Sequence, residues 1–268
     1  MKKLLALTMA ALMVLSLAAC GGEGAPASDV PATDSAELTY AVEGGSAGEA
    51  AANEKGWNTV VVEAQSNALM EVAAGTSDAA IIDLLMAGAM IGEGTSYPNL
   101  TYTDKLTTEE YGIGCRKGSN LTDYINEVLA ETYADGSMRD IATTYGVQEA
   151  LLEQPAPTGA YPEGGDVAYI QDKGTLIVGI TDFEPMDYKD ADGSWIGFDA
   201  DMAKKVAEKL GVEAQFVEIE WGNKIMELEG KSIDVVWNGM TLTDEVTSAM
   251  NCTVPYCNNA QVVVVPNS

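Results

Sequence analysis

Short apolar runs alternate with segments of helical periodicity along this chain, and this alternation constrains the fold more than any other feature of the sequence. Residues 38–42, 59–62 and 79–82 are apolar runs of strand length, and Ala-rich or amphipathic segments separate them. Strands that alternate with helices in this way are typical of βαβ units, in which parallel strands are covered by the intervening helices. The sequence therefore predicts an α/β fold.

The same pattern restarts after a segment that is rich in Pro and Gly. Residues 154–168 contain Gln-Pro-Ala-Pro and Pro-Glu-Gly-Gly, which are typical of a linker. Two α/β units joined in this way predict two lobes, with a ligand-binding cleft where the carboxyl ends of their strands face each other. Further strands are expected at 111–115, 175–181, 214–219, 233–237 and 261–265, and the other helices at 67–74, 121–133 and 138–145.

The clearest amphipathic helix is predicted between Asp199 and Gly211. Met202, Val206 and Leu210 are spaced four residues apart and so lie on one face of this helix. Asp199 is expected to cap the helix at its start, and Gly211 is expected to end it.

The first 37 residues have the features of an export signal followed by a tether. Lys2 and Lys3 precede an apolar stretch, residues 4–17, that is too short to span a membrane. The run Leu-Ala-Ala-Cys that ends at Cys20 resembles the bacterial lipobox, which implies lipidation of Cys20. We expect residues 1–19 to be a lipoprotein signal peptide and residues 20–37 a flexible tether. An ordinary cleaved signal with an incidental Cys is the alternative.

The composition excludes several classes of function. The chain has 41 Asp and Glu against 14 Lys and Arg, a formal net charge of −27, so its surface would repel nucleic acid and anionic lipid. It has no His, which removes Ser-His and Cys-His nucleophile pairs and imidazole metal sites. The sequence contains no CxxC pair that would suggest a zinc site, so we expect no metal and no cofactor. Cys252 and Cys257 could form a disulfide or remain two separate thiols.

From residue 174 onward the chain resembles the first lobe of the family 3 solute-binding proteins, which serve ABC importers of polar amino acids. The matching segments are 174–179, 185–190, 197–203 and 233–245, and the last, which contains Asn-Gly-Met-Thr-Leu-Thr-Asp-Glu, is the most specific. Residues 38–153 are similar to the rest of that fold. The resemblance implies an α/β, two-lobed, type II periplasmic-binding-protein-like fold.

The order of the two parts is the reverse of the family's order, which we interpret as a circular permutation. A fusion of two half-proteins that pair with other chains is the alternative. The expected organisation is lobe 2 at 38–110, the return strand and closing helices of lobe 1 at 111–153, the linker at 154–168 and the first part of lobe 1 at 169–268.

The resemblance implies that residues of both lobes bind the solute. Asp83, at the end of a lobe 2 strand, is expected to meet its ammonium group, and a helix N-cap is the alternative role. The amides of Gly239 and Met240 and the hydroxyl of Thr241 are expected to meet its carboxylate. The family's Arg is replaced by Val246. Another cation, or amides, hydroxyls and a helix N-terminus, would then hold the anion, unless the solute has no α-carboxylate.

Five further residues complete the predicted site. Phe183 and Trp221 match positions of aromatic walls, with core packing as the alternative. Asp182 and Asn238 are expected at strand ends that face the cleft, or in turns. Ser46 is expected to present its hydroxyl to the solute or to cap a helix.

The resemblance implies a lipid-anchored, monomeric solute-binding protein on the extracytoplasmic face of the cell membrane. It would capture a small polar solute, with an amino acid as the first choice, and deliver it to an ABC importer without catalysis. One alternative is a dehydratase-like enzyme that uses Asp182 and Glu184 as acid and base. The other is a free-standing sensory protein on the same fold.

Overall fold

Two large β-sheets with flanking helices make up most of the computed structural model, which describes residues 37–267. A small third sheet pairs β7 (Tyr188–Lys189) with β8 (Trp195–Ile196). The predicted signal peptide, Cys20 and nearly all of the predicted tether lie outside the described residues. No helix among the described residues is both long and apolar enough to cross a membrane. The mixed α/β architecture that the sequence predicts is confirmed.

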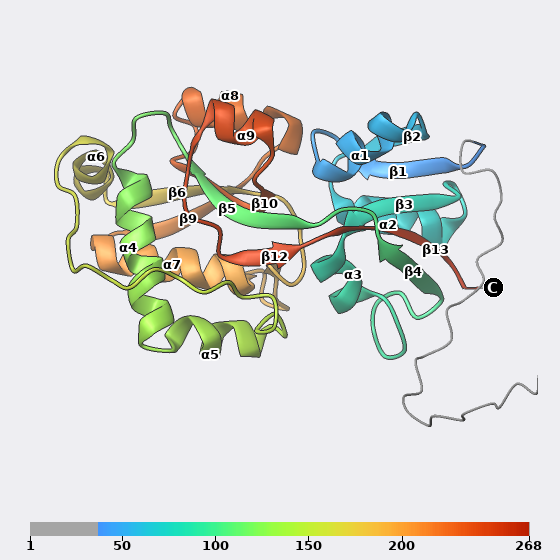
Figure 1. Ribbon diagram of the computed structural model, residues 1–268, viewed down its shortest axis with the longest axis horizontal. Helices are drawn as coiled ribbons and strands as arrows, with labels where there is room; N and C mark the ends of the chain where they lie inside the picture. The colour runs from blue at the N-terminus through green and yellow to red at the C-terminus, as the bar shows by residue number, and fades with distance from the viewer. Residues whose placement is uncertain (1–36, 268) are drawn as a thin grey trace, which may run out of the picture. The chain divides into compact units, whose positions relative to one another are not determined.

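The first sheet has the strand order β2-β1-β3-β13-β4 (Figure 1). Strands β1, β2 and β3 are parallel, and β13 runs antiparallel between β3 and β4. Tyr40 and Val42 of β1 pack on the side of α1, whereas Ala41 packs on the side of α2. Both faces are therefore buried, which explains the continuous apolar runs. The elements are β1 (Thr39–Glu43), α1 (Ala47–Lys55), β2 (Asn58–Val62), α2 (Gln65–Ala74), β3 (Ala79–Asp83), α3 (Leu84–Met90), β4 (Leu100–Lys105) and β13 (Gln261–Pro266).

The second sheet has the strand order β11-β5-β10-β6-β9, and β12 also pairs with β5. Alternation places Val235 and Trp237 of β10 in the core under α4 and α7, and Val236 in the core under α8 and α9 (Figure 1). The strands are β5 (Glu109–Cys115), β6 (Thr175–Ile180), β9 (Glu213–Glu218), β10 (Val235–Thr241), β11 (Asn251–Cys252) and β12 (Cys257–Asn259). The helices are α4 (Leu121–Ala134), α5 (Ser137–Thr144), α6 (Gly165–Lys173), α7 (Phe198–Leu210), α8 (Lys224–Glu229) and α9 (Asp244–Ala249).

The chain passes between the two sheets twice, once from β4 to β5 and once from β12 to β13. The two crossing segments are hydrogen-bonded to each other. The amide of Leu106 donates to the carbonyl of Gln261 at 2.8 Å, and the amide of Gln261 donates to Thr107 Oγ1 at 2.9 Å. The two lobes are therefore joined by a pair of strands that lie side by side.

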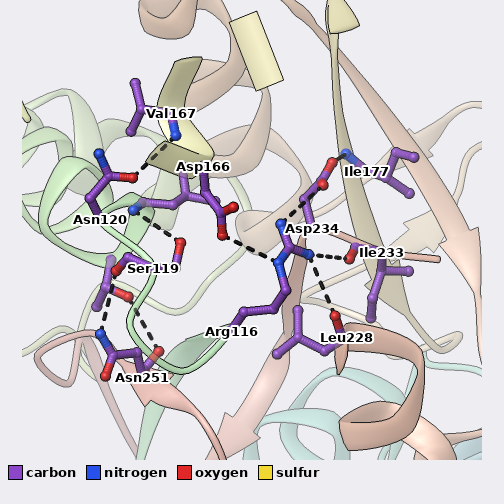
Figure 2. Close-up of polar contacts among 12 residues, drawn as sticks. Arg116, Ser119, Asn120, Asp166, Val167, Ile177, Leu228, Ile233, Asp234 and Asn251 are labelled. Carbon is purple, nitrogen blue, oxygen red and sulfur yellow. Dashed lines mark hydrogen bonds and ion pairs between the residues drawn. The ribbon is translucent and has the colours of Figure 1, made fainter. Parts of the chain in front are cut away.

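A buried Arg fixes the far end of β5 to its lobe. Nη1 of Arg116 donates to the carbonyl of Ile233 at 2.9 Å, and Nε lies 3.2 Å from Asp166 (Figure 2). Nη2 lies 3.5 Å from Asp234, whose second oxygen accepts from Lys173 and from the amide of Ile177. These contacts join β5, β6, α6 and the start of β10, so the two sequence halves form one lobe.

The predicted linker is docked onto the same lobe. The side chain of Asn120 donates to the carbonyl of Gly164 at 2.8 Å and accepts from the amide of Val167 at 3.2 Å (Figure 2). Helix α6 begins at Gly165, inside the predicted linker range, because Val167 and Ile170 enter the core. The irregular part of the linker is therefore shorter than the Pro and Gly content predicts.

One local expectation is wrong. The N-cap of α7 is Gly197, and Asp199 is buried instead, accepting from Gly239 N at 2.7 Å. Of the two possibilities for Cys252 and Cys257, the structure has the separate thiols, since Cys115, Cys252 and Cys257 are all free among the described residues. Cys252 and Cys257 pair with β5 three residues apart, which is about 10 Å along a strand and too far for a disulfide.

The topology provides a test of the proposed circular permutation. Strands β1 and β13 flank β3, and Tyr40 and Val264 pair with its adjacent residues Ala79 and Ala80, so these two residues, each close to an end of the described chain, are about 10 Å apart. We expect a chain in which residue 267 is joined to residue 38 by a short Gly-Ser linker, and which is opened between residues 155 and 163, to fold to the same structure. Circular dichroism and thermal unfolding measure this, and a variant that remains unfolded would contradict the permutation.

Candidate functional site

A cavity of about 240 Å³ lies where the two sheets face each other. Its walls come from the carboxyl ends of strands and from the first turns of the helices that follow them, which is where α/β sheets bind ligands. The lining residues from lobe 2 are Glu43, Gly45, Ser46, Ala47, Ala50, Gln65 and Asp83. Those from lobe 1 are Phe183, Trp221, Lys224, Asn238, Gly239, Met240, Thr241, Thr243, Asp244, Glu245 and Val246.

Eight of the nine predicted ligand-binding residues line this cavity; the exception is Asp182. Asp182 lies with Glu184 in a separate hollow beside Lys189 and Glu218. Its neighbour Phe183 is buried and enters the cavity wall, and successive side chains of an extended segment point to opposite sides. The sequence placed Asp182 at the correct strand end but on the wrong side of it.

Asp83 lies in the cavity wall, but its carboxylate is already occupied by protein donors. Tyr111 Oη donates to Oδ1 at 2.7 Å, Gln261 donates to Oδ1 at 3.0 Å, and Asn259 also donates to it. Gln65 donates to Oδ2. The side chain of Asp83 accepts no capping hydrogen bond from α3, so the alternative N-cap role is not formed. Burial, with the negative charge of a nearby Glu, raises the pKa of Asp83 to about 7.

Asn238 and Gly239 are also engaged within the protein. Asn238 accepts from the amide and hydroxyl of Thr181 and donates to Asp187 at 2.8 Å. The amide of Gly239 donates to Asp199, so it does not point to a solute carboxylate. A Cβ at Gly239 would lie 2.5 Å from a ring carbon of Phe183, and its φ of +54° also favours Gly.

The remaining predicted residues of the cavity wall, Ser46, Thr241, Met240 and Trp221, also contact other groups of the protein. Ser46 caps α1 by accepting from the amide of Glu49 at 3.1 Å, which leaves its hydroxyl hydrogen free for another acceptor. Thr241 donates from Oγ1 to Glu109 at 3.0 Å. Met240 and Trp221 are buried and form apolar wall.

Lys224 is a site residue that the sequence reasoning missed. It is the cavity's one cationic side chain among the lining residues, and it is buried. Nζ donates to the carbonyl of Gly45 at 2.9 Å and to that of Trp221 at 3.2 Å, and it lies 4.8 Å from the centre of the Trp221 indole. Burial lowers its pKa, and the charges of Glu245, Glu43 and Glu49 oppose this effect.

Glu43 is the second missed residue. It ends β1, only 2% of it is exposed, and its Oε1 has no hydrogen-bond partner. Burial, together with the charge of Asp83, raises the pKa of Glu43 to about 8, although Thr181, Lys224 and Gln65 favour the charged form. The sequence signal was a single acidic residue at the end of an apolar strand, directly before the Gly-Gly-Ser loop.

The structure is a two-lobed α/β fold with a cavity between the lobes. Residues 176–268 match the family of bacterial extracellular solute-binding proteins, family 3. The resemblance that the sequence motifs predict is thus confirmed for this segment, whereas the circular permutation stays a prediction.

The curated relatives match shorter regions. The L-cystine-binding protein TcyJ of Escherichia coli is 30% identical over 41% of this chain and 42% of its own length. A probable amino-acid ABC transporter-binding protein of Haemophilus influenzae is 31% identical over 44% of this chain and 47% of its own length. The cyclohexadienyl dehydratase of Pseudomonas aeruginosa is 28% identical over 35% and 36%. The chain therefore spans less than half the length of each of these relatives.

Solved structures give partial matches as well. The ancestral amino acid-binding protein AncCDT-1 is 39% identical over 31% of this chain and 37% of that chain, with a TM-score of 0.31. The arginine-bound form of truncated ArgBP from T. maritima is 40% identical over 30% of this chain and 39% of that chain, with a TM-score of 0.30.

The buried carboxyl groups predict how stability depends on pH. The folded-state pKa is about 8 for Glu43 and about 7 for Asp83 and Asp199, against about 4 for unfolded carboxyl groups. The folded protein binds these protons more tightly, so their stabilisation is complete below about pH 4 and is lost as the pH rises through 7 to 8. We therefore expect the thermal midpoint of the solute-free protein to decrease as the pH is raised from about 5 to about 9.

Thermal unfolding followed by circular dichroism at a series of pH values measures this slope. Glu43→Gln should make the fall smaller, and Glu54→Gln, at an exposed position of α1, should leave it unchanged. A midpoint that rises over this interval would contradict the prediction.

Proposed function

We propose that this protein captures a small polar solute, an amino acid in the first place, in the cavity between its lobes and delivers it to an ABC importer. The observation that carries this proposal is that a buried cation, Lys224, and a buried carboxylate, Glu43, line one cavity whose wall also contains Trp221 and Phe183. Opposite charges at one site suit a solute that carries both an anionic and a cationic group. The relatives named as amino-acid-binding or cystine-binding proteins support the same class of solute.

Lys224 is proposed to take the role of the Arg that Val246 replaces. Both side chains line the same cavity, so a cation at either position reaches the same solute. An ammonium group has three donors, and Lys224 uses two of them on Gly45 and Trp221. The third is left for a solute carboxylate.

The cellular setting is proposed from the sequence. The charged start, the apolar stretch and Cys20 support export and a lipid anchor on the extracytoplasmic face of the membrane. The large negative charge supports a monomer, because like surfaces repel.

The dehydratase-like alternative has less support from the geometry. Its proposed acid and base, Asp182 and Glu184, lie in a separate hollow and not in the cavity between the sheets. One relative is a cyclohexadienyl dehydratase, so turnover is measured directly in the test below.

A screen of the purified protein against L-amino acids, small carboxylates and sugars tests the proposed function. We expect one or a few L-amino acids to raise the thermal midpoint, by a stabilisation of about 2.7 kcal/mol at a hundredfold excess over Kd. The solute should be recovered unchanged, as judged by its NMR spectrum. A shift with none of the amino acids, or conversion of the bound solute, would contradict the proposal.

Lys224→Met tests the proposed grip on the carboxylate. The substitution keeps most of the side-chain volume and removes the charge, so the affinity for a bound amino acid should fall by about tenfold or more. The affinity for the corresponding decarboxylated amine should change by less than about threefold, since that ligand lacks the anionic group. Lys55→Met, at an exposed position of α1, is the control. Equal losses for both ligands, measured by calorimetry, would remove Lys224 from this role.

A further inference from the structure

The cavity holds more negative than positive side chains. Glu43, Asp83, Asp244 and Glu245 line it, against Lys224. A zwitterionic solute adds no net charge, so it would leave this surplus in place. The question is which of the four carboxylates a solute cation can reach.

Three of the four are engaged elsewhere or solvated. Asp83 accepts from four protein donors, three on Oδ1 and one on Oδ2, so protein groups already take most of its roughly four acceptor positions. Asp244 and Glu245 are exposed in the first turn of α9, where water solvates and screens their charges.

Glu43 is different from the other three. It is 2% exposed, it lines the cavity, and its Oε1 has no hydrogen-bond partner. None of the ion pairs found within residues 37–267 includes Glu43, and Lys224 directs two of its donors to carbonyl groups instead. A buried carboxylate oxygen without a partner is costly, so a cationic ligand that supplies this partner gains affinity.

Charge balance within the cavity points the same way. Two buried carboxylates, Glu43 and Asp83, face one buried cation, Lys224, and one negative charge is left over when both acids are ionised. A solute with a net charge of +1 cancels it, and a neutral or acidic solute does not.

We infer that Glu43 binds a cationic group of the solute, and that the site selects amino acids or related amines that carry a net positive charge on an amine or guanidinium group. The inference rests on the proposed function, because the cavity must first be a solute site. The class of solute is then a cationic one, and the residue that recognises its cation is Glu43 and not Asp83.

Binding of a cation at Glu43 has a proton signature. The groups that face Glu43 are Asp83 from β3, Gln65 from α2, Thr181 after β6 and Lys224 from α8, and burial holds the pKa of Glu43 near 8. At neutral pH the empty site therefore keeps its proton. A bound cation favours the carboxylate, so binding releases that proton and the affinity rises with pH up to about 8.

Calorimetry on the purified protein tests this, with L-arginine, L-lysine, L-glutamine and L-glutamate as probes. At neutral pH in two buffers of different ionisation enthalpy, we expect L-arginine or L-lysine to bind at least about tenfold more tightly than L-glutamine, with release of a proton. Glu43→Gln should remove most of this preference and most of the proton release. Glu54→Gln is the matched control and should change neither.

The outcomes separate the inference from the proposed function. Binding of L-glutamine or L-glutamate in preference to the cationic probes would overturn the inference and leave the solute-binding function standing. So would an unchanged preference in Glu43→Gln, or cation binding by the wild-type protein without proton release, a measurement that needs no variant. Binding of none of the probes and of no other amino acid would overturn both.

Discussion

The structure depends on one buried carboxylate, that of Asp83, at the place where the chain crosses twice between the sheets. Its donors are Tyr111 on β5, Gln65 on α2, and Asn259 and Gln261 on the second crossing. A single side chain thus joins both crossings to the end of β3. The strongly raised pKa shows that burial of this charge is costly, and the four donors offset much of that cost. Because Asp83 and Gln65 also line the cavity, the junction between the lobes extends into the wall of the site.

The regular elements could be predicted because their signals are local. Residues 79–83 are buried on both faces, and a continuous apolar run is what such a strand requires. Strand β4, Leu-Thr-Tyr-Thr-Asp-Lys, lies at the sheet edge and carries polar residues, so its pattern resembles a loop. Helix α6 could not be predicted, because the glycines before it are typical of a linker. Only the core contacts of Val167 and Ile170, which are tertiary, favour a helix there. Motif spacing placed Asn238 to Thr241 correctly at the cavity.

The roles of the site residues were harder to predict than their positions. Asn238 and Gly239 lie where the motif places them. The side chain of Asn238, however, is hydrogen-bonded to Thr181, and the amide of Gly239 is hydrogen-bonded to Asp199. Partners of this kind are far away in the sequence: Lys224 donates to a carbonyl 179 residues earlier. A pattern of residue types over a short window contains no information on such pairs. Glu43 was missed for the same reason, because its importance comes from the burial of an oxygen that has no hydrogen-bond partner.

Under the proposed function, two features of the cavity act together: Val246 stands where the resemblance implies an Arg, and the buried Glu43 lines the same cavity. A guanidinium holds a carboxylate through two parallel bonds, whereas Lys224 offers one remaining N–H, so the proposed site would hold the anionic end of the solute less firmly. Affinity would then come from another group. Glu43 is the one buried lining carboxylate with an unpartnered oxygen, and a solute cation would supply the partner of that oxygen. A cavity that holds carboxylates weakly and cations strongly discriminates by the charge of the solute's amine or guanidinium group more than by its amino-acid backbone.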